Sequence, residues 1–415
     1  MASGEFVDIL SNLDLSRYME FVQIEGSFVF RDGKGICKVP STPTEAATSS
    51  LMGFFEKRRA KNFFQYCANL DLENPLTWNK INLHVVPMGE VFKSYDLDSN
   101  TIDFIGHALA LHSNESYLKE PALMTIQKIK LYMESMMRFG KTPYLYPLYG
   151  LGELPQGFAR LSAIYGGTYM LGIKFEGFLM NEEEGSGAGS AGDGSAGSAS
   201  GTGTGNNYVC GVKVDSEKTF KCKRGVICDP SYAPERVCLS QRVIRAICLL
   251  DHPIKSAADS CQIILPQKQL NRHHDIYLTC LSSGHNVCAS GYFLVQISTI
   301  VETANPEQEI APALNLLGPI LEKFVSISNL YEPLIDGRAD GIFVSKSLDS
   351  STHFETVCED VKNIYDRIFQ KSLQVSSRPT AEEEAAMGVT GMSSASASGS
   401  NPANHSSTSG GVYEV

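Results

Sequence analysis

Hydrophobic side chains along residues 41–140 recur every three to four positions, the spacing that places them on one face of an α-helix. The pattern therefore predicts a unit of packed helices over this range. The residues that carry it are Leu51, Phe55, Phe63, Tyr66 and Leu70 in the first part and Ala122, Ile126, Ile129, Met133 and Met137 in the second.

Between positions 209 and 303 the pattern changes to short runs rich in β-branched and aromatic residues, which is typical of strands. Helical spacing returns over residues 307–324 and 354–369. The sequence therefore predicts a mixed α/β (α+β) fold with a partly antiparallel sheet. The strand candidates are residues 243–250, 261–265, 275–281 and 292–298.

Two stretches of small polar residues interrupt these patterns. Residues 185–206 are rich in glycine, serine and alanine, and the tail over residues 376–415 is similarly biased. Neither holds enough apolar surface to offset the entropy lost on ordering, so both are predicted to be disordered. Strand-like residues 174–179 and 208–213 flank the first tract, which is therefore predicted to extend a hairpin; a linker between domains is the alternative.

Composition narrows the class of protein. With 415 residues, of which 43% are hydrophobic and 20% charged, the chain is long enough for two domains with substantial cores. No run approaches the roughly 18 apolar residues of a membrane span and no secretory signal is evident, so we expect a cytosolic protein. The net charge of -11 argues against nucleic acid as a partner.

The side chains that usually carry catalysis or bind metal lack the required spacing. The 11 cysteines include no Cys-x-x-Cys pair and are predicted to be reduced, packed thiols rather than zinc ligands. His107 is predicted to be a hydrogen-bonded core histidine and not a ligand, and His273 with His274 to lie in an exposed turn. The basic patch within residues 57–61 is predicted to be a solvated helix face, with contact to an acidic membrane surface as the alternative.

Residues 140–171 have the pattern of a loop, a helix, a stop and a strand. Pro155 fits a first helical turn, and Glu153 lies where the helix dipole favours an anion. The glycine pair at 166–167 is predicted to end the helix before a strand at residues 168–171.

Residues 143–171, with Gly-Glu-Leu-Pro-Gln-Gly-Phe-Ala-Arg near the centre, resemble the central signature of Rab GDP dissociation inhibitors. That family shares a fold with the Rab escort proteins and, more distantly, with flavin monooxygenases. Escort proteins are similar around residues 152–155, but residues 156–160 and 162–165 look like the inhibitor branch, so an escort protein is the second interpretation. The resemblance covers nearly all of residues 15–370 and includes segments 25–29, 38–41, 51–59, 102–111, 228–232, 331–333 and 352–356.

The resemblance implies a fold, a function and partners. The fold is a larger domain like those that bind FAD or NAD(P), with mixed sheets, plus a smaller all-helical domain. The implied function is to bind GDP-bound, prenylated Rab GTPases, slow GDP release, and extract them from and deliver them to membranes, with no catalysis and no cofactor. The implied partners are the Rab, its geranylgeranyl lipid and, transiently, a membrane.

The same resemblance divides the chain and implies a Rab-binding platform. Residues 1–40 and 141–375 belong to the larger domain, residues 41–140 to the helical prenyl-binding domain, and residues 376–415 to the tail. In an unrelated protein the platform residues would simply be a helix end and a solvated surface. They are Glu153, Gln156, Arg160, Thr168 and Met170.

Two further sites are implied by the resemblance. Arg138 and Tyr144 correspond to a mobile loop that meets a membrane or a receptor; a plain connecting loop is the alternative. The prenyl pocket falls in the helical domain, where methionines suit a site that adapts to a lipid; ordinary core packing is the alternative. The pocket candidates are Ile105, Leu109, Ile129, Met133 and Met136.

One alternative of a different class and one departure from the family accompany the resemblance. A flavin- or nicotinamide-dependent oxidoreductase would need an early strand followed by Gly-x-Gly-x-x-Gly, which is not present.

The opening strand and glycine-rich turn of a typical inhibitor also have no counterpart here. Part of the Rab platform is therefore expected to be missing with this N-terminal segment.

Overall fold

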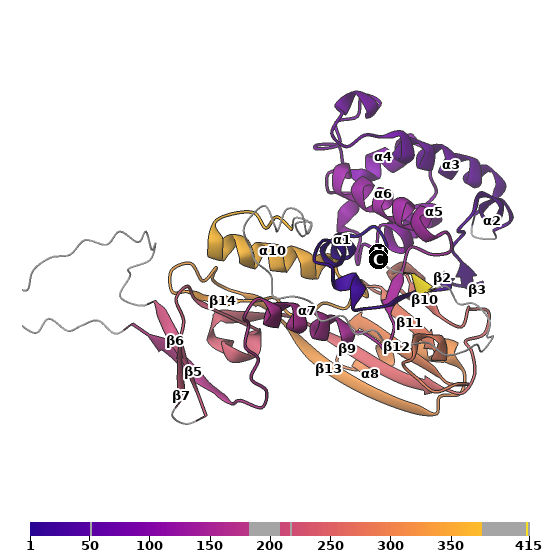
Figure 1. The fold of residues 1–415 in the computed structure, drawn as a ribbon. Helices are drawn as coiled ribbons and strands as arrows, with labels where there is room; N and C mark the ends of the chain where they lie inside the picture. Colours follow the sequence, from indigo (N-terminus) through magenta and orange to yellow (C-terminus); the bar gives the residue numbers. More distant parts are fainter. Residues whose placement is uncertain (50–51, 182–207, 216–217, 376–411, 414–415) are drawn as a thin grey trace, which may run out of the picture.

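A group of helices lies above a seven-stranded sheet, and a smaller three-stranded sheet lies to one side (Figure 1). This computed structural model describes residues 1–49, 52–181, 208–215, 218–375 and 412–413. The mixed helix-and-sheet class predicted from the sequence is confirmed. The tract at residues 185–206 lies outside the described residues, and so does the tail at 376–415 apart from Val412–Tyr413.

The large sheet has the strand order β13-β9-β12-β11-β10-β2-β3. Its neighbouring strands are antiparallel except β10 and β2, which are parallel. Residues near the start of the chain thus complete a sheet built mostly from residues 237–333. The bounds are β2 Gly26–Arg31, β3 Gly35–Lys38, β9 Val237–Leu250, β10 Cys261–Leu265, β11 Ile276–Ser282, β12 Phe293–Ile300 and β13 Glu322–Pro333.

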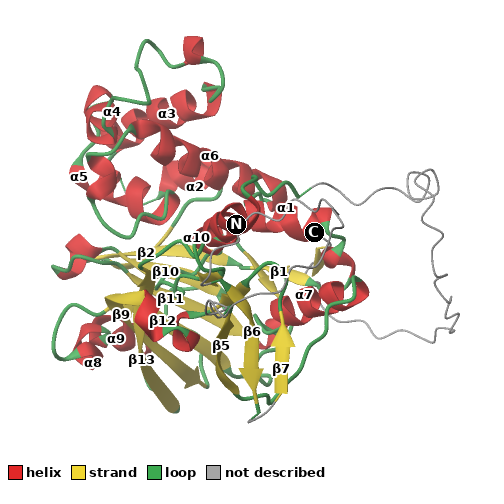
Figure 2. Ribbon diagram, turned by 90° about the vertical axis from the view of Figure 1, so that its left-hand side faces the viewer, coloured by secondary structure: helices red, strands yellow, loops and turns green. Residues whose placement is uncertain are grey.

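Helices cover both faces of this sheet. Figure 2 shows α8 (Pro306–Glu309) and α9 (Ala311–Leu317) below it and the larger helical group above it. The lower core joins fully buried sheet residues such as Ile263 and Leu278 to Ile310 at the start of α9. The prediction of helix over residues 307–324 is wrong at its end, because Glu322 begins β13 and pairs with β9.

The upper helical group is organised around α6 (Ala122–Phe139), which contacts α3 (Phe54–Asn69) and α4 (Met88–Ser94). Its core continues into the sheet through Ile264, Tyr277 and Leu281, so the helices and the sheet share one core. The remaining elements of the group are α2 Pro43–Thr48, η2 Pro75–Thr77, α5 Ser99–Asp103, the π-helix η3 Phe104–Leu109 and η4 Ser116–Leu118.

The other elements form a layer beside the sheet. Strands β5 and β6 pair antiparallel on either side of residues 182–207, which confirms the predicted hairpin. In the described part of the chain, no helix combines the length and the apolar character that a membrane span requires. The bounds are α1 Glu5–Asn12, η1 Leu15–Arg17, β1 Phe21–Gln23, β4 Leu145–Pro147, α7 Glu153–Ile164, β5 Phe175–Met180, β6 Val209–Val214, β7 Lys218–Lys221, β8 Val226–Cys228, η5 Pro230–Tyr232, η6 Pro234–Arg236, η7 Gln267–Leu270, η8 Ser283–His285, β14 Ile342–Val344, α10 Glu355–Phe369 and β15 Val412–Tyr413.

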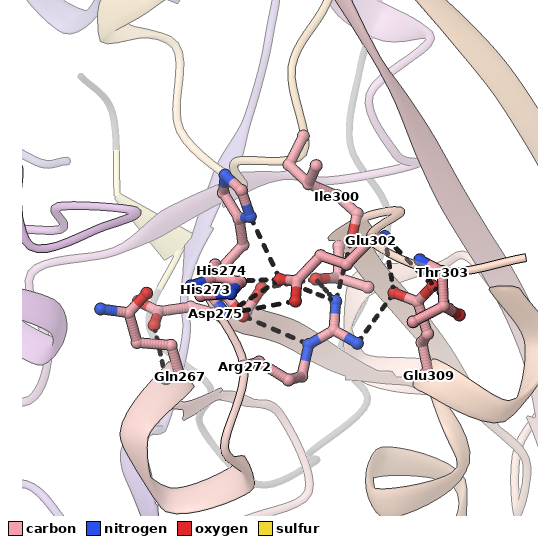
Figure 3. Close-up of polar contacts among 10 residues, drawn as sticks. Gln267, Arg272, His273, His274, Asp275, Ile300, Glu302, Thr303 and Glu309 are labelled. Carbon is pink, nitrogen blue, oxygen red and sulfur yellow. Dashed lines mark hydrogen bonds and ion pairs between the residues drawn. The ribbon is translucent and has the colours of Figure 1, made fainter.

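A buried ion pair links the segment before β11 to α8 (Figure 3). Arg272 Nη1 donates to Glu309 Oε2 at 2.8 Å, and Arg272 Nη2 donates to the carbonyl of Ile300 at 2.9 Å. Glu309 also accepts from the backbone N–H of Thr303 at 2.7 Å. Burial opposes ionisation of Glu309, but these hydrogen bonds outweigh it and lower its pKa.

The turn that holds His273 and His274 closes the same network. His273 is exposed, as predicted, but His274 is half-buried. Glu302 Oε1 accepts from the backbone N–H of His274 at 2.9 Å and lies 3.1 Å from its Nδ1, which draws this side chain inward. All 11 cysteines are free thiols, as predicted.

Replacement of Glu309 by alanine should lower the free energy of unfolding by about 3 kcal/mol, because it removes the closer of the two carboxylates that pair with the buried Arg272, the other being that of Glu302. The loss should be complete above pH 4.5 and should shrink below it, since the lowered pKa means that the carboxylate loses its contribution only as pH falls. Urea unfolding at several pH values measures both effects.

Glu307→Ala is the matched control on the same helix. The Glu307 side chain is 65% exposed and its ion pair with Lys323 is at the surface, so this change should stay within about 0.5 kcal/mol of the parent. Equal losses in the two variants would contradict the importance of the buried pair.

Candidate functional site

Helix α7 is held by one face only. Leu154 is 5% exposed and packs with Leu15 and Met19 below it. Gly157 allows a close approach, because a Cβ atom there would lie 3.0 Å from Met19 Sδ. In Figure 1 the helix lies below α1, whose Phe6 side chain packs against Phe158. The opposite face of α7 is left open to solvent.

The predicted platform residues lie on that open side. Gln156 and Arg160 are exposed on α7, Glu153 is half-buried at its first turn, and Thr168 with Met170 is exposed in the segment that follows. The structure therefore brings all five to one stretch of surface around α7 and residues 165–173, which we call the α7 surface.

Residues 168–171 are not the strand that their composition predicted. Helix α7 ends at Ile164, and Gly166 has a positive φ of 85° that turns the chain away. The backbone N–H of Gly167 donates to the carbonyl of Ser162 at 2.9 Å and closes the helix end. The chain then runs without regular structure to β5, which begins at Phe175, and none of the described strands pairs with residues 168–171.

Several large apolar side chains on the α7 surface are exposed to solvent. Leu171 is 90% exposed, Tyr165 72%, Tyr169 57% and Met170 50%. Exposed apolar groups that lie together in this way usually mark a binding surface, whereas scattered ones do not. Tyr165, Tyr169 and Leu171 were not among the residues that sequence reasoning selected, although the run of large side chains just after the glycine stop is visible in the sequence.

Arg160 supplies the surface with a cation that is free to bind. Its guanidinium carbon lies 4.1 Å from the centre of the Tyr18 ring, and Tyr18 is itself 43% exposed. Stacking on an aromatic ring orients the guanidinium and leaves its N–H groups available for a carboxylate. Aromatic residues, methionine and arginine are the types enriched at protein interfaces.

The two residues implied in a mobile loop lie differently. Tyr144 is 7% exposed and faces Tyr132 in the core, which does not fit a loop that meets a membrane. Arg138 is exposed at the end of α6, and its Nη1 donates to the carbonyl of Ala2 at 2.8 Å. Burial of the ring raises the pKa of Tyr144 well above its ordinary value.

The candidate prenyl-pocket residues gather in the core of the helical group. Ile105 and Ile129 are fully buried, Leu109 is 6% exposed, and Met133 with Met136 is partly buried against the same core. These side chains contact protein rather than an open groove. A lipid would reach Ile105, Leu109 and Ile129 only by separation of the helices around α6, whereas Met133 and Met136 are partly exposed.

A buried polar centre lies where the helical group meets the sheet. His107, in the π-helix η3, donates from Nδ1 to Asp275 Oδ2 at 2.7 Å and also lies 2.8 Å from the carbonyl of His112. The prediction of a hydrogen-bonded core histidine is confirmed for this nitrogen. Nε2 points instead at Asp103 Oδ1 and Glu115 Oε1, each 3.7 Å away, and forms no hydrogen bond among the described residues.

Opposing effects act on the ionisable groups of this centre. Burial disfavours the imidazolium of His107, but the neighbouring carboxylates of Asp275, Glu115 and Asp103 outweigh it and raise its pKa to about 10. The neighbouring His107, together with the ammonium of Lys268, lowers the pKa of Glu115 to about 2. Burial raises the pKa of Asp103. The centre therefore attracts positive charge strongly.

Comparisons with known proteins identify relatives along nearly the whole chain. A family model described as GDP dissociation inhibitor matches residues 1–200 and 202–380. Rab GDP dissociation inhibitor beta of Canis lupus familiaris is 50% identical over 370 residues, which are 89% of this chain and 77% of the dog protein. The protein of the same name from Rattus norvegicus matches equally, with 50% identity over 370 residues, 89% of this chain and 77% of its own length.

A solved structure is similar in three dimensions as well. The crystal structure of a Rab GDI from Plasmodium falciparum has a TM-score of 0.79 and 40% sequence identity. The match covers 90% of this chain and 82% of the Plasmodium chain. The observed arrangement of helices and sheets is therefore one that a solved member of the same group adopts.

The exposed apolar residues of the α7 surface should be dispensable for folding. Leu171→Ser should change the free energy of unfolding by less than about 0.5 kcal/mol, because the side chain is 90% exposed. Leu154→Ala, on the buried face of α7, should cost about 2 to 5 kcal/mol because it opens a cavity. Chemical denaturation compares the two; a large loss for Leu171→Ser would mean that Leu171 packs within the fold.

Proposed function

The chain belongs to the GDP dissociation inhibitor family, and from that premise we propose that it binds prenylated Rab GTPases in their GDP-bound form. In this role it slows GDP release, extracts the Rab from membranes and delivers it to them during vesicle transport. It is a binding protein and not an enzyme. The observation that supports this most directly is the exposed aromatic and cationic α7 surface, which lies on the family signature.

The α7 surface suits the switch regions of a GTPase. Tyr165, Tyr169 and Leu171 offer apolar area that gains free energy when covered, at about 25 cal/mol per Å². Arg160 offers a guanidinium that is already oriented by Tyr18 and can bind a carboxylate of the partner. We assign the platform to Glu153, Gln156, Arg160, Thr168 and Met170.

Preference for the GDP-bound state can be explained by differential binding alone, with no catalysed reaction. The switch segments of GTPases are ordered by the γ-phosphate and released after hydrolysis, so a surface that fits the released arrangement binds that state better. Binding shifts the population toward the state that binds more tightly, and this retards nucleotide exchange. One bound complex therefore both holds GDP and removes the Rab from the pool that can be activated.

Extraction requires a receptor for the lipid. A prenyl chain gains about 0.8 kcal/mol for each CH₂ that it buries in a bilayer, so the protein must offer a comparably apolar site. We assign this site to the helical unit of residues 41–140, with Ile105, Leu109, Ile129, Met133 and Met136 as its lining. The closed packing of these residues means that lipid entry and helix separation occur together. The two methionines at its edge adapt to such a change.

The remaining parts of the chain are consistent with separate units for Rab binding and lipid binding. We assign residues 1–40 and 141–375 to the unit that carries the platform, and we place the protein in the cytosol with transient visits to membranes. On α3 the exposed Phe54 and Phe55 lie beside Arg58 and Lys61, an arrangement that suits a brief contact with an acidic lipid surface.

Two other functions are less well supported. An escort protein would use a related platform, but the relatives that share 50% identity carry the inhibitor name. A flavin-dependent oxidoreductase is disfavoured by membership of this family, and an absorbance spectrum of the purified chain checks this, because bound flavin is yellow.

Arg160→Ala should weaken binding to GDP-loaded Rab by about fivefold or more, the loss typical of an interface residue worth at least about 1 kcal/mol. The fold should be unaffected because the side chain is exposed. Titration calorimetry measures the affinity, with Arg58→Ala on α3 as an exposed arginine control. Equal affinity of Arg160→Ala and the parent would remove Arg160 from the platform.

Met133→Gln should reduce the release of prenylated Rab from membranes while leaving its affinity for unprenylated, GDP-loaded Rab unchanged. A polar amide in an apolar pocket loses free energy unless it finds a hydrogen bond. The assay incubates membranes that carry prenylated Rab with each variant and measures Rab in the soluble fraction.

Met124→Gln is the control on the same helix, because Met124 is 56% exposed. Release should be normal in this control. If Met133→Gln and Met124→Gln behave alike, the lipid does not bind at the core of the helical unit.

A further inference from the structure

Three side chains at the base of the helical group converge on one point. Asp103, His107 and Glu115 each present one ligand atom, and these atoms lie within 4.8 Å of one another. Asp103 and His107 are buried, and Glu115 is half-buried. The π-helix η3 follows Asp103 directly, so Asp103 and His107, four residues apart, point at the same place. Short π-helical segments often occur at functional sites.

The state of His107 Nε2 is independent evidence for a bound ligand, beyond the clustering of carboxylates. This nitrogen is fully buried, points between two carboxylate oxygens and has no hydrogen-bond partner among the described residues. A buried nitrogen without a partner costs about 1 to 3 kcal/mol in a folded protein. Asp103 Oδ1, on the opposite side of the same point, also accepts no hydrogen bond among those residues.

The distances match those around a small divalent cation. Bonds of about 2.0 to 2.2 Å from zinc to nitrogen and oxygen place neighbouring ligands of a tetrahedron about 3.3 to 3.6 Å apart. His107 Nε2 lies 3.7 Å from both Asp103 Oδ1 and Glu115 Oε1. Two of the three pairs of ligand atoms are therefore within a few tenths of an ångström of that separation, and the third pair lies within 4.8 Å.

The second nitrogen of His107 is held as it is in metal sites. Histidine ligands usually donate their other N–H to a carboxylate or carbonyl, which fixes the ring and makes the free nitrogen a better ligand. His107 Nδ1 lies 2.7 Å from Asp275 Oδ2 and 2.8 Å from the carbonyl of His112. Asp275 is held in turn, because its Oδ1 accepts from the backbone N–H of Gln267 at 2.8 Å.

The charge of the centre also favours an added cation. Three carboxylates, those of Asp103, Glu115 and Asp275, lie in ion-pair range of His107. Lys268 is the cation that contacts them, at 2.6 Å from Glu115 Oε1 and 4.0 Å from Asp103 Oδ1. When His107 is neutral, two negative charges remain uncompensated within this group, which is the charge of one divalent ion.

We propose that Asp103, His107 and Glu115 form a binding site for one zinc-type divalent cation at the junction of the helical group and the sheet. Imidazole with carboxylates is a ligand set of this class. Lys268 is 44% exposed and competes with the ion for Glu115 from the solvent side.

The bound ion would join two parts of the fold that are far apart in the sequence. Its three ligands come from residues 103–115, while Asp275 directly precedes β11 of the sheet. Anything that binds the folded state and not the unfolded one stabilises the fold by mass action. The proposal therefore concerns the scaffold and is independent of Rab binding.

Cobalt(II) provides the test, because it takes zinc sites and reports their geometry in its visible spectrum. The full chain is treated with a chelator, dialysed and titrated with Co²⁺, and a thermal melt is recorded with and without Zn²⁺. We expect one equivalent of Co²⁺ with the visible bands of a four-coordinate site, and a higher melting temperature with Zn²⁺. Thiolate ligands would add an intense near-ultraviolet band, which separates this site from binding by the 11 free cysteines.

Three variants distinguish the site from adventitious binding. Glu115→Gln removes a half-buried ligand and should weaken Co²⁺ binding by about tenfold or more and abolish the zinc-dependent rise in melting temperature. Lys268→Ala removes the competing ammonium and should tighten binding. Glu90→Gln, an exposed carboxylate on α4, should behave as the parent.

Other results would overturn the proposal. Absence of Co²⁺ binding by the parent chain, a spectrum dominated by the thiolate band, or equal binding by Glu115→Gln and Glu90→Gln would each show that the centre is a hydrogen-bonded polar cluster without a metal.

Discussion

The contact between His107 and Asp275 is the constraint on which the arrangement of the two halves depends. Both side chains are fully buried, and their atoms lie 2.7 Å apart although the residues are 168 positions apart in the chain. Burying ionisable groups costs several kcal/mol unless their hydrogen bonds are made, so the helical group can settle on the sheet only where these two side chains meet. Apolar packing alone tolerates small displacements, whereas this polar contact does not.

That constraint extends from the core toward the surface. Asp275 directly precedes β11, and its carbonyl accepts a hydrogen bond from Thr299, which in turn accepts one from Arg272. Arg272 is itself held by Glu309 on α8. A continuous set of buried polar contacts thus connects α8, below the sheet, with the helical group above it. Helix α7 packs on a separate apolar cluster that includes Leu15 and Met19. Its outer face does not contribute to this packing. Substitution of the exposed apolar residues on that face therefore leaves the packing of the core unchanged.

The sequence predicts elements well where one local signal dominates. The strand at residues 261–265 agrees with β10 at both ends, because an apolar run between turns has few alternatives in a buried sheet. The strand predicted at residues 168–171 is absent, since a strand also needs a partner and no strand in the described part of the chain pairs with this segment. Glu322 joins β13 instead of a helix for the opposite reason, because β9 offers it a partner.

For the site, the sequence predicts the location of residues but not how their side chains pack. The family signature locates the platform on α7, but it does not reveal the exposure of Tyr165 and Leu171, which depends on what packs nearby. The role of His107 was predictable only in part. Burial follows from its apolar helical neighbours, while its partner Asp275 is remote in sequence and is found only once the fold brings them together.

The connection between α6 and α7 determines how the platform and the lipid site influence each other. It is short, and it is anchored midway by β4, which pairs with β1, and by the buried Leu148. If the helices around α6 separate to admit a lipid, as we propose, these anchors keep the movement from α7. Free energies of binding at distant sites that share no partners are nearly additive. On the proposed function, the platform would therefore recognise the nucleotide state of a Rab before its lipid is accommodated, and each site would contribute separately to holding the complex in solution.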